Sequence, residues 1–395
     1  MTSERQPNIR VGRAERHGPT VLQVLPALET GGAERGTVEI AAALQAAGWR
    51  AIVASAGGSL EYELRRTGAA HWELPLDRKH PLIVARNAEQ LARLIRSQGV
   101  DLVHARSRAP AWSAYTAARA TGRPFVTTVH AVHGEAPWKH WYNAVMARGD
   151  VVIAVSDFVA EHLRRHHRRA APRLVTIPRG IDTAIFNPAN VTGQRIVQLA
   201  DAWRLADGVN VVMLPARFAR LKEQELLLRA LSLLGRHDVI AVLLGGEAGP
   251  DAERHEEEIE RLLIRRRYRG QVRIVPTCRD MAAAYMLADV VVAPALRSTG
   301  AWNVIVEAQA MGRPVIASSQ GVAGDLIRHG ETGWLTPPGN PEALASALNE
   351  ALSLGHAGRE RLAEAARAGI EQRFSLAAMQ ASTLAVYRDL LARWR

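Results

Sequence analysis

The chain has 395 residues, of which 48% are hydrophobic and 23% are charged. This length is too great for one typical domain, and the composition is that of a globular protein, not a disordered one. A single cysteine, Cys278, excludes an intrachain disulfide and fits a reducing compartment. The formal net charge of +11 permits nucleic acid, an anionic membrane face or an anionic small ligand as a partner.

The N-terminal residues 1–19 predict a basic flexible arm, because they are charged and have no apolar core. We therefore expect neither a secretory signal nor a membrane span, since the longest apolar runs fall far short of the roughly 20 residues that a span needs. Two stretches suit a membrane interface, namely PWKHWYNAVMARGD (137–150) and HLRRHHRRAAPR (162–173). A solvated helix end with a few partly buried aromatic residues explains them as well. The expected location is the cytoplasm.

In the first half of the chain, short Val/Ile/Leu runs alternate with helical patterns. The expected strands are VLQVLPA (21–27), RAIVAS (50–55), HWELPL (71–76), DLVHAR (101–106), FVTTVH (125–130), VVIAVS (151–156) and LVTIPR (174–179). Helical spacing appears between them, for example at 34–48 and 88–99. Near-continuous apolar strands separated by helices predict a parallel sheet that is covered on both faces.

The pattern breaks at the turn-rich stretch 181–195 and then restarts. The expected strands of the second half are NVVMLPA (210–216), VIAVLLG (239–245), VRIVPT (272–277), DVVVAPA (289–295), PVIASS (314–319) and GWLTPP (333–338). The last stretch, 374–395, predicts one amphipathic helix. We therefore predict an α/β fold with two Rossmann-like domains, over 20–190 and 191–373, followed by a separate helix at 374–395.

Two strand-to-helix loops carry candidate phosphate-binding residues. In LETGGAERG (28–36), Gly31 and Gly32 allow a sharp turn into a helix N-terminus, which favours an anion, although Gly-Gly is also an ordinary turn. In LPARFARLKEQELLLRAL (214–231), Arg217 and Lys222 suit a diphosphate and the charge that grows on a leaving group. Two solvated surface cations are the alternative.

Two further stretches carry an acid and a histidine. In RSTGAWNVIVEAQAMGRPVIAS (297–318), Glu307 is expected at the start of a helix, where it complements the helix dipole or accepts hydrogen bonds from a vicinal diol such as ribose. In FVTTVHAVHGE (125–135), His130 ends a strand and has either a structural or a chemical role. We expect no metal site, because no HExxH motif or Cys/His cluster is present.

Seven motifs, in this order, resemble the retaining family 4 glycosyltransferases of the GT-B fold. They are GGAERGTVEIAAAL, DLVHARSRAPAWSA, VIAVSDFVAEHL, IPRGID, ADVVVAPA, VEAQAMGRPVIAS and GETGWLTPPGNPEALA. The resemblance covers the chain from about residue 20 onward and is strongest to bacterial enzymes of lipopolysaccharide or surface-polysaccharide synthesis. It implies two Rossmann-like domains facing across a cleft. The N-terminal domain would bind the acceptor and the C-terminal domain a nucleotide-diphosphate sugar, with helix 374–395 crossing back onto the N-terminal domain.

The resemblance also implies roles for individual residues. Arg217 and Lys222 match the diphosphate-binding pair, and Glu307 matches the second Glu of an acid pair, which holds the ribose. Gly31 and Gly32 match the glycine loop beside the phosphates, and His130 matches a histidine near the donor sugar. The family in general uses no bound metal and keeps the anomeric configuration. The implied acceptor is lipid-linked or a glycan, at the inner face of the cell membrane, and no cofactor or nucleic acid is expected.

The departures from the family pattern lie on the sugar side of this site. Thr299 occupies the place of the first Glu of the acid pair, and Gly300, Ala301 and Trp302 follow it where the family has Ala-Phe-Gly. A threonine is neutral and shorter, so it does not replace a carboxylate that accepts bonds from two sugar hydroxyls. Two smaller departures are Glu223 after Lys222 and Ala131 after His130.

Two hypotheses follow. The retained Arg217, Lys222, Glu307 and His130 favour an active transferase with altered donor recognition. Thr299, Trp302 and Glu223 favour instead a nucleotide-binding scaffold that has lost turnover. A sugar-nucleotide epimerase is the third reading, but the EAQAMGRP block fits the transferases better. A nucleic-acid binder is supported by charge alone.

Overall fold

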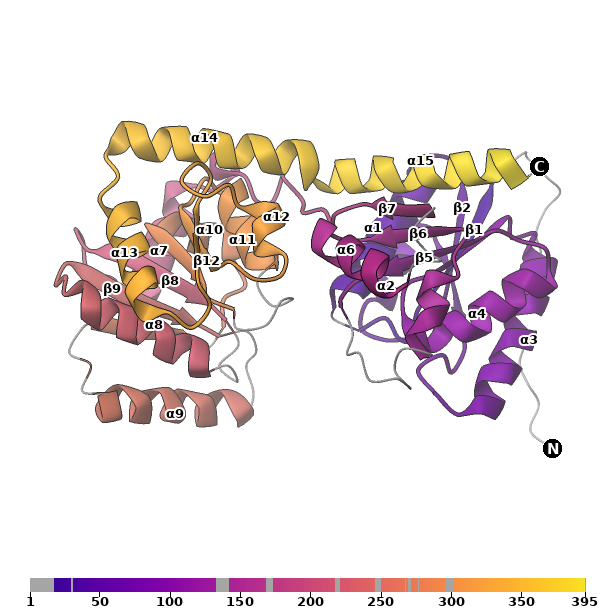
Figure 1. Cartoon of the computed structure of the whole chain (residues 1–395), viewed down its shortest axis with the longest axis horizontal. Coiled ribbons are helices and arrows are strands. Elements are labelled where there is room, and N and C mark those ends of the chain that lie inside the picture. Colours follow the sequence, from indigo (N-terminus) through magenta and orange to yellow (C-terminus); the bar gives the residue numbers. More distant parts are fainter. Residues whose placement is uncertain are drawn as a thin grey trace. The chain divides into compact units, whose positions relative to one another are not determined.

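A computed structural model of the chain describes residues 18–29, 31–132, 142–167, 173–216, 221–245, 250–266, 268, 271–275, 277–295 and 302–394 (Figure 1). Its contacts divide the chain into two compact units. The first consists of the described residues up to 153 together with 163–175 and 383–395, and the second of 154–162 and 176–382. The chain crosses more than once between the two units, so each unit contains segments that are far apart in the sequence.

The first unit contains a sheet with the strand order β3-β2-β1-β4-β5-β6-β7. The strands are β1 (Thr20–Val24), β2 (Arg50–Ser55), β3 (Ala70–Glu73), β4 (Leu102–Ala105), β5 (Phe125–Val129), β6 (Val151–Ala154) and β7 (Leu174–Thr176). The pairs from β3 to β5 are parallel. The connecting helical segments are α1 (Gly32–Ala46), α2 (Glu61–Arg66), α3 (Pro81–Gln98), α4 (Arg108–Ala120) and η1 (Ala144–Ala147). The helix α6 (Asp157–His166) connects β6 to β7 and is divided between the two units.

The second unit contains a parallel sheet with the order β10-β9-β8-β11-β12-β13. The strands are β8 (Asn210–Pro215), β9 (Val239–Leu244), β10 (Gln271–Val275), β11 (Val290–Ala293), β12 (Val315–Ser318) and β13 (Trp334–Thr336). The helical segments are η3 (Pro188–Asn190), α7 (Gly193–Ala202), α8 (Leu221–Leu234), α9 (Pro250–Arg266), α10 (Met281–Leu287), α11 (Trp302–Ala310), α12 (Ala323–Leu326), α13 (Pro341–Leu352) and α14 (His356–Arg373). Two Rossmann-like parallel sheets, as predicted, are therefore confirmed.

Both faces of the second sheet are buried, which explains its continuous apolar strands. Along β8, Val211 and Met213 belong to one hydrophobic cluster, which includes side chains of α10 and α11. Val212 and Leu214 belong to a second cluster, which includes side chains of α8 and α13. Since successive side chains of a strand point to opposite faces, every position of β8 must be apolar when helices cover both faces.

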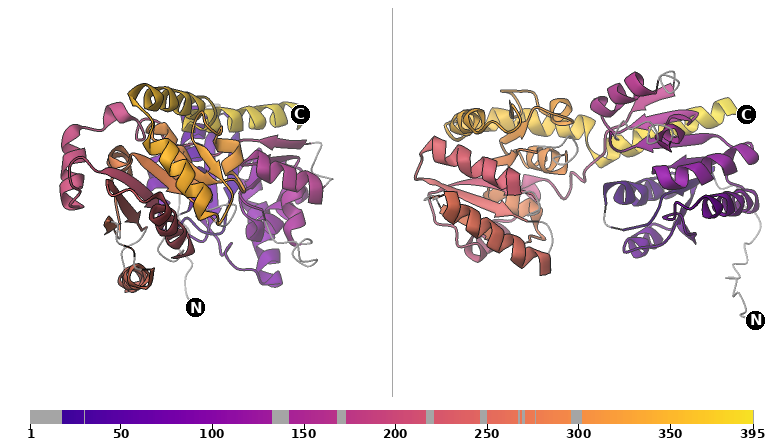
Figure 2. Two further views of the ribbon diagram at one scale, coloured as in Figure 1. Left: turned by 60° about the vertical axis from the view of Figure 1, so that its left-hand side comes forward. Right: turned by 60° about the horizontal axis from the view of Figure 1, so that its bottom comes forward.

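The C-terminal helix α15 (Leu376–Trp394) begins directly after α14, and its second half belongs to the first unit. The hydroxyl of Tyr387 lies 2.6 Å from Nδ1 of His104 on β4, and Nε1 of Trp394 donates to the carbonyl of Gly122 at 3.0 Å. In both views of Figure 2 the yellow helix runs along the first unit's strands. Both His104 and Tyr387 are fully buried, so this bond joins α15 to the centre of the sheet.

Replacing Tyr387 with Phe is expected to lower the free energy of unfolding by about 1–3 kcal/mol, because it leaves the buried Nδ1 of His104 without this partner. Urea denaturation measures the change. The control is Tyr62→Phe on α2, since the Tyr62 side chain is 73% exposed and its hydroxyl is open to water. Equal stability of the two variants would contradict a structural role for the Tyr387–His104 bond.

Among the helices in the described part of the chain, none is both long enough and apolar enough to cross a membrane.

Candidate functional site

Glu307 lies in the second half of α11, and the prediction that it stands at a helix start is wrong. The helix begins at Trp302, and its first turn holds no acidic residue. The run from Val304 to Val306 has low intrinsic helix preference, since β-branched residues lose side-chain freedom in a helix. Burial overrides that preference here, because Ile305 and Val306 are fully enclosed in the core. Complementation of the helix dipole therefore does not explain this carboxylate.

Tyr285 holds the carboxyl group of Glu307. Its hydroxyl donates to Oε2 of Glu307 at 2.9 Å, and its ring is fully buried on α10, 6.3 Å from the ring of Phe186. Burial raises the pKa of Glu307 to about 7, although the bond from Tyr285 and the charge of Arg179 both act to lower it. Burial and the neighbouring carboxylate raise the pKa of Tyr285 well above its usual value, so it remains a donor. Glu307 is thus an oriented acceptor that titrates near neutral pH.

Arg179 and Trp302 form the neighbouring part of this site. The guanidinium carbon of Arg179 lies 5.0 Å from the ring centroid of Trp302, a cation–π contact, and the indole is only 8% exposed. The family pattern, which has a glycine in place of Trp302, predicts a position in the loop beside the ligand. The structure places its side chain in the core instead, at the first residue of α11 and beneath Arg179.

Close backbone packing fixes the chain on either side of Arg179. The amide of Ile181 donates to the carbonyl of Phe374 at 2.9 Å, and the amide of Leu376 donates back to Ile181 at 2.7 Å. A Cβ on Gly180 would lie only 2.5 Å from the Cα of Leu376, so only glycine fits there. The motif IPRGID therefore holds Arg179 at a set position.

Gln309 fastens α11 to the motif GETGWL. Its fully enclosed amide donates to the carbonyl of Thr332 at 3.0 Å and lies 3.2 Å from the hydroxyl of the same residue. A buried amide with both bonds made is a rigid connection. Two sequence motifs that are far apart in the chain, VEAQAMGRPVIAS and GETGWLTPPGNPEALA, therefore meet at Gln309. This residue lies on α11, the helix that also carries Glu307.

In the first unit, Gly31 is the N-cap of α1 and Gly32 is its first residue. This agrees with the predicted loop that opens into a helix. A Cβ on Gly31 would collide with the carboxylate of Glu34, which lies in the first turn of the helix. An acid therefore already complements the positive end of α1, so a phosphate bound there would have to displace it or share the site.

His130 directly follows β5 and is partly buried. His104 lies on the neighbouring strand, β4, and its Nε2 is 2.7 Å from the hydroxyl of Thr128 on β5. Burial, followed by the charges of Arg106 and His130, keeps the pKa of His104 well below its usual value. His104 is therefore a neutral structural group, and the sequence pattern had not singled it out.

Several predicted site residues lie outside what the structure describes. Arg217, Thr299 and Gly300 are not among the described residues. Lys222 is the second residue of α8, and its side chain is not described; the adjacent Glu223 is buried. Of the predicted set, Gly31, Gly32 and His130 belong to the first unit, and Lys222 and Glu307 to the second.

Sequence reasoning missed Tyr285 and assigned no role to Arg179. The signal for Tyr285 was a single large polar aromatic residue in the helix MAAAYML, whose other buried positions are alanines. Arg179 lies within a quoted motif and follows a strand, which is where ligand sites gather in parallel sheets. Among the described residues there is no group of three His, Cys, Asp or Glu side chains that could hold a metal ion.

Comparison with known proteins identifies the family. A family model described as "Glycosyltransferase Family 4" matches residues 30–185, and one described as "Glycosyl transferases group 1" matches residues 209–353. The D-inositol 3-phosphate glycosyltransferase of Xylanimonas cellulosilytica is 31% identical over 323 residues, which are 75% of this chain and 74% of that protein. The chain belongs to glycosyltransferase family 4. The resemblance seen in the sequence is therefore confirmed, and glycosyl transfer is the activity that the family supports.

Solved structures of glycosyltransferases agree with this assignment. A glycosyltransferase from Rickettsia africae has 33% sequence identity and a TM-score of 0.87, with 94% of this chain and 98% of that one covered. The Anabaena protein HepE, solved with UDP and glucose, has 22% identity and a TM-score of 0.77, over 93% and 99% of the two chains. The second likeness is one of fold. Together they identify the two parallel-sheet units as those of a GT-B glycosyltransferase.

Proposed function

We propose that this family 4 glycosyltransferase moves a hexose-type sugar from a nucleotide-diphosphate sugar to a hydroxyl group of a lipid-linked or glycan acceptor. The second unit would bind the donor, and the first unit would bind the acceptor. The observation that carries the proposal is Glu307, a carboxylate on α11 that the buried Tyr285 orients with a 2.9 Å hydrogen bond. A fixed carboxylate suits the two hydroxyl groups of a ribose, because both of its oxygens accept hydrogen bonds.

The proposed reaction keeps the anomeric configuration and uses no bound metal. The bond between the anomeric carbon and the diphosphate oxygen breaks, and the acceptor oxygen bonds to that carbon on the same face. The acceptor's proton passes to the departing diphosphate. Arg217 and Lys222 would offset the charge that grows on the leaving group, a role that elsewhere falls to a metal ion.

The acceptor defines the biological setting. We propose synthesis of lipopolysaccharide or a surface polysaccharide, with the protein bound peripherally to the inner face of the cell membrane. The basic composition supports this, because anionic lipids attract clusters of Lys and Arg. Inositol phosphate is a competing acceptor, because the 31% identical relative is a D-inositol 3-phosphate glycosyltransferase.

A screen of donors and acceptors tests the proposal. The protein is incubated with a panel of nucleotide-diphosphate hexoses and either membrane lipid extract or D-inositol 3-phosphate. We expect release of nucleoside diphosphate with one donor and a glycosylated lipid product. A glycosylated inositol phosphate would support the competing acceptor, and no release with any donor would contradict the transferase proposal.

The scaffold hypothesis rests on Thr299 and is tested with Thr299→Glu. If the protein binds nucleotide diphosphate in calorimetry but turns over only after this substitution, it is a binding protein that has lost catalysis. Turnover by the natural protein, with no gain in the Glu variant, would rule the scaffold hypothesis out. In that case we infer that Thr299 contributes to recognition of the donor sugar.

A further inference from the structure

A large apolar cavity lies in the first unit, between α3 and α4, and none of the candidate site residues lines it. Its volume is about 830 Å³. Small apolar side chains from both helices form much of its lining, together with two aromatic residues. They are Val84, Ala88, Ala92, Ala117, Trp112 and Tyr142. Cavities of this size and composition hold small apolar ligands.

Three hydrogen-bonding groups in this lining have partners within the protein. Nε1 of Trp112 donates to the carbonyl of Tyr142 at 3.2 Å, and the hydroxyl of Thr116 donates to the carbonyl of Trp112 at 3.0 Å. One guanidinium nitrogen of Arg96 donates to the carbonyl of Ala120 at 3.3 Å. A peptide in this cavity would have to leave its own backbone groups without partners, which is costly. A hydrocarbon chain carries no such groups.

Positive charge surrounds the cavity. Lys79, Arg93 and Arg96 line it, against the single acid Glu89. Lys79 and Arg93 are exposed, and within the described part of the chain neither forms an ion pair. The occupant should therefore combine an apolar body with an anionic end.

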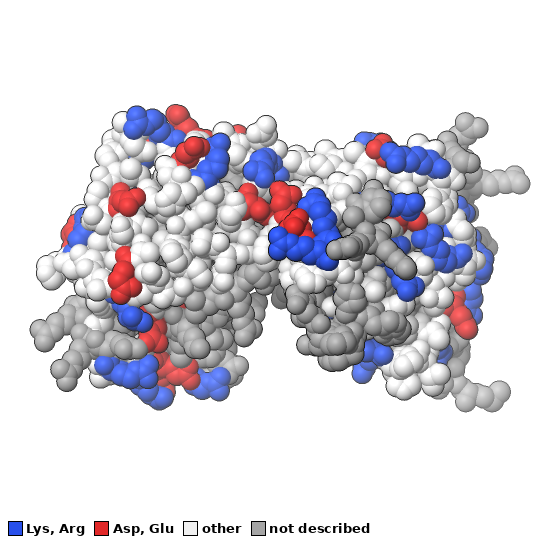
Figure 3. All heavy atoms as spheres, viewed as in Figure 1, with Lys and Arg blue, Asp and Glu red and all other residues white. Residues whose placement is uncertain are grey.

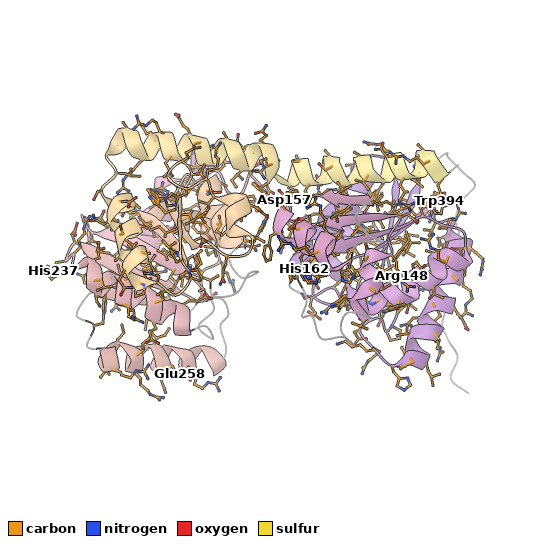
Figure 4. All side chains as sticks on the ribbon, in the orientation of Figure 1. Arg148, Asp157, His162, His237, Glu258 and Trp394 are labelled. Carbon is orange, nitrogen blue, oxygen red and sulfur yellow. The ribbon has the colours of Figure 1, made fainter. Side chains whose placement is uncertain are left out.

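The surface around the cavity has the same character. The guanidinium carbon of Arg148 lies 5.3 Å from the ring centroid of Trp112, and Figure 4 labels Arg148 over α4. In Figure 3, blue Lys and Arg atoms gather over the part of this unit that carries α4. Leu82, in the first turn of α3, is 75% exposed. Together with the apolar lining of the cavity, this leucine extends the apolar surface of α3 outward beside the basic residues.

We propose that this cavity binds one acyl chain of an anionic phospholipid, with the headgroup at Lys79 and Arg93. The inference rests on the membrane part of the proposed function and gives it a specific site. The acyl chain of the lipid leaves the bilayer and occupies the space between α3 and α4, where it displaces water from the apolar lining. The cations at the edge then contact the phosphate. Membrane binding would depend on both the charge of the lipid and the free volume of the cavity.

The test uses flotation of the full chain with vesicles of phosphatidylglycerol and phosphatidylcholine, compared with vesicles of phosphatidylcholine alone. The double variant Lys79→Ala/Arg93→Ala is expected to bind the anionic vesicles about 25-fold more weakly, at about fivefold for each cation. Ala85→Phe fills the cavity without changing charge and should weaken binding to the same vesicles. The matched control Arg65→Ala/Arg66→Ala removes two exposed cations from α2, away from the cavity lining, and should bind as the natural protein does.

A second measurement asks whether the chain enters the cavity. Phosphatidylglycerol brominated on its acyl chains quenches the fluorescence of nearby tryptophans. The natural protein should therefore be quenched more strongly by these vesicles than the Trp112→Phe variant, which lacks the tryptophan in the cavity. Circular dichroism checks that each variant folds.

If vesicles bind but neither Ala85→Phe nor Trp112→Phe changes the signal, the cavity inference fails and membrane docking stands. If no vesicle binds, both fail, while the donor screen still tests the transferase. A dimer in light scattering that Ala85→Phe dissociates would overturn the lipid in favour of a second copy.

Discussion

Glu307→Gln is expected to weaken binding of a nucleoside diphosphate by about 10- to 100-fold. The substitution keeps the size of the side chain and an acceptor oxygen for Tyr285, but it removes the negative charge. Hydrogen bonds to a charged group contribute about 1.5–3 kcal/mol, and this contribution is what the ribose hydroxyls would lose. Isothermal titration calorimetry of the two proteins at pH 8 measures the difference.

The pH dependence of binding is the sharper part of this expectation. The pKa of Glu307 is about 7 in the folded protein, so the ionised acceptor is present above pH 7 and is lost below it. We expect the affinity of the natural protein to fall by about tenfold per pH unit as the pH decreases below 7. The Gln variant should show no such decrease. A parallel pH dependence in both proteins would contradict the assignment of the titrating group.

The same shift predicts that Glu307 destabilises the fold at neutral pH. Its pKa in the folded protein is about 7, above the ordinary value of 4.5, so the folded state binds more protons than the unfolded state between these two pH values. Stability from this group is therefore greatest below about pH 4.5 and decreases as the pH rises to 7. At pH 8 the Gln variant should be more stable, by up to about 3 kcal/mol. Thermal unfolding at pH 5 and pH 8 measures this, with the exposed Glu342→Gln as the control.

Lys222→Ala is expected to lower kcat by about 100- to 1000-fold with a smaller effect on donor binding. Loss of one preoriented donor to developing negative charge has effects of this size. The prediction comes from the match of Lys222 to the diphosphate-binding lysine of the family and from its place in the first turn of α8. Initial rates at saturating donor measure kcat once the donor screen has identified a substrate.

The control for Lys222 is Arg229→Ala. Arg229 lies on the same helix, and its side chain is exposed. Each variant removes one cation from α8, so the two variants change the net charge of the second unit equally. If both lower kcat equally, the effect is one of net charge, and the specific role of Lys222 is refuted.

The sequence predicted the strands of both sheets, and the structure supplied their order. Every apolar run that predicted a strand forms one, and the breaks at glycine- and proline-containing turns separate them correctly. The reason is physical: a strand covered on both faces must be apolar at every position, as Val211 to Leu214 show, so the pattern needs no knowledge of its partners. The strand ends were less exact, because residues such as Pro26 and Ala27 continue the apolar pattern after the β1 strand has ended.

The helical context of Glu307 was harder to predict. The β-branched residues Val304 to Val306 are weak helix formers, and the core that receives Ile305 and Val306 favours a helix that begins at Trp302. The same holds for His104, which reads as one polar residue in an apolar strand. Its partner Tyr387 is 283 residues away, and no local pattern connects them.

Sequence by itself thus determined the family and the presence of two parallel sheets, and it proposed the candidate residues Arg217, Lys222, Glu307, His130, Gly31 and Gly32. These follow from local spacing and motif order. Only the tertiary structure decided that Tyr285 orients Glu307, that Trp302 packs beneath Arg179, and that Glu34 already occupies the helix end at Gly31. Hydrogen bonds, pKa shifts and stacking depend on distances of a few ångströms between elements far apart in the chain, and only the folded packing sets those distances.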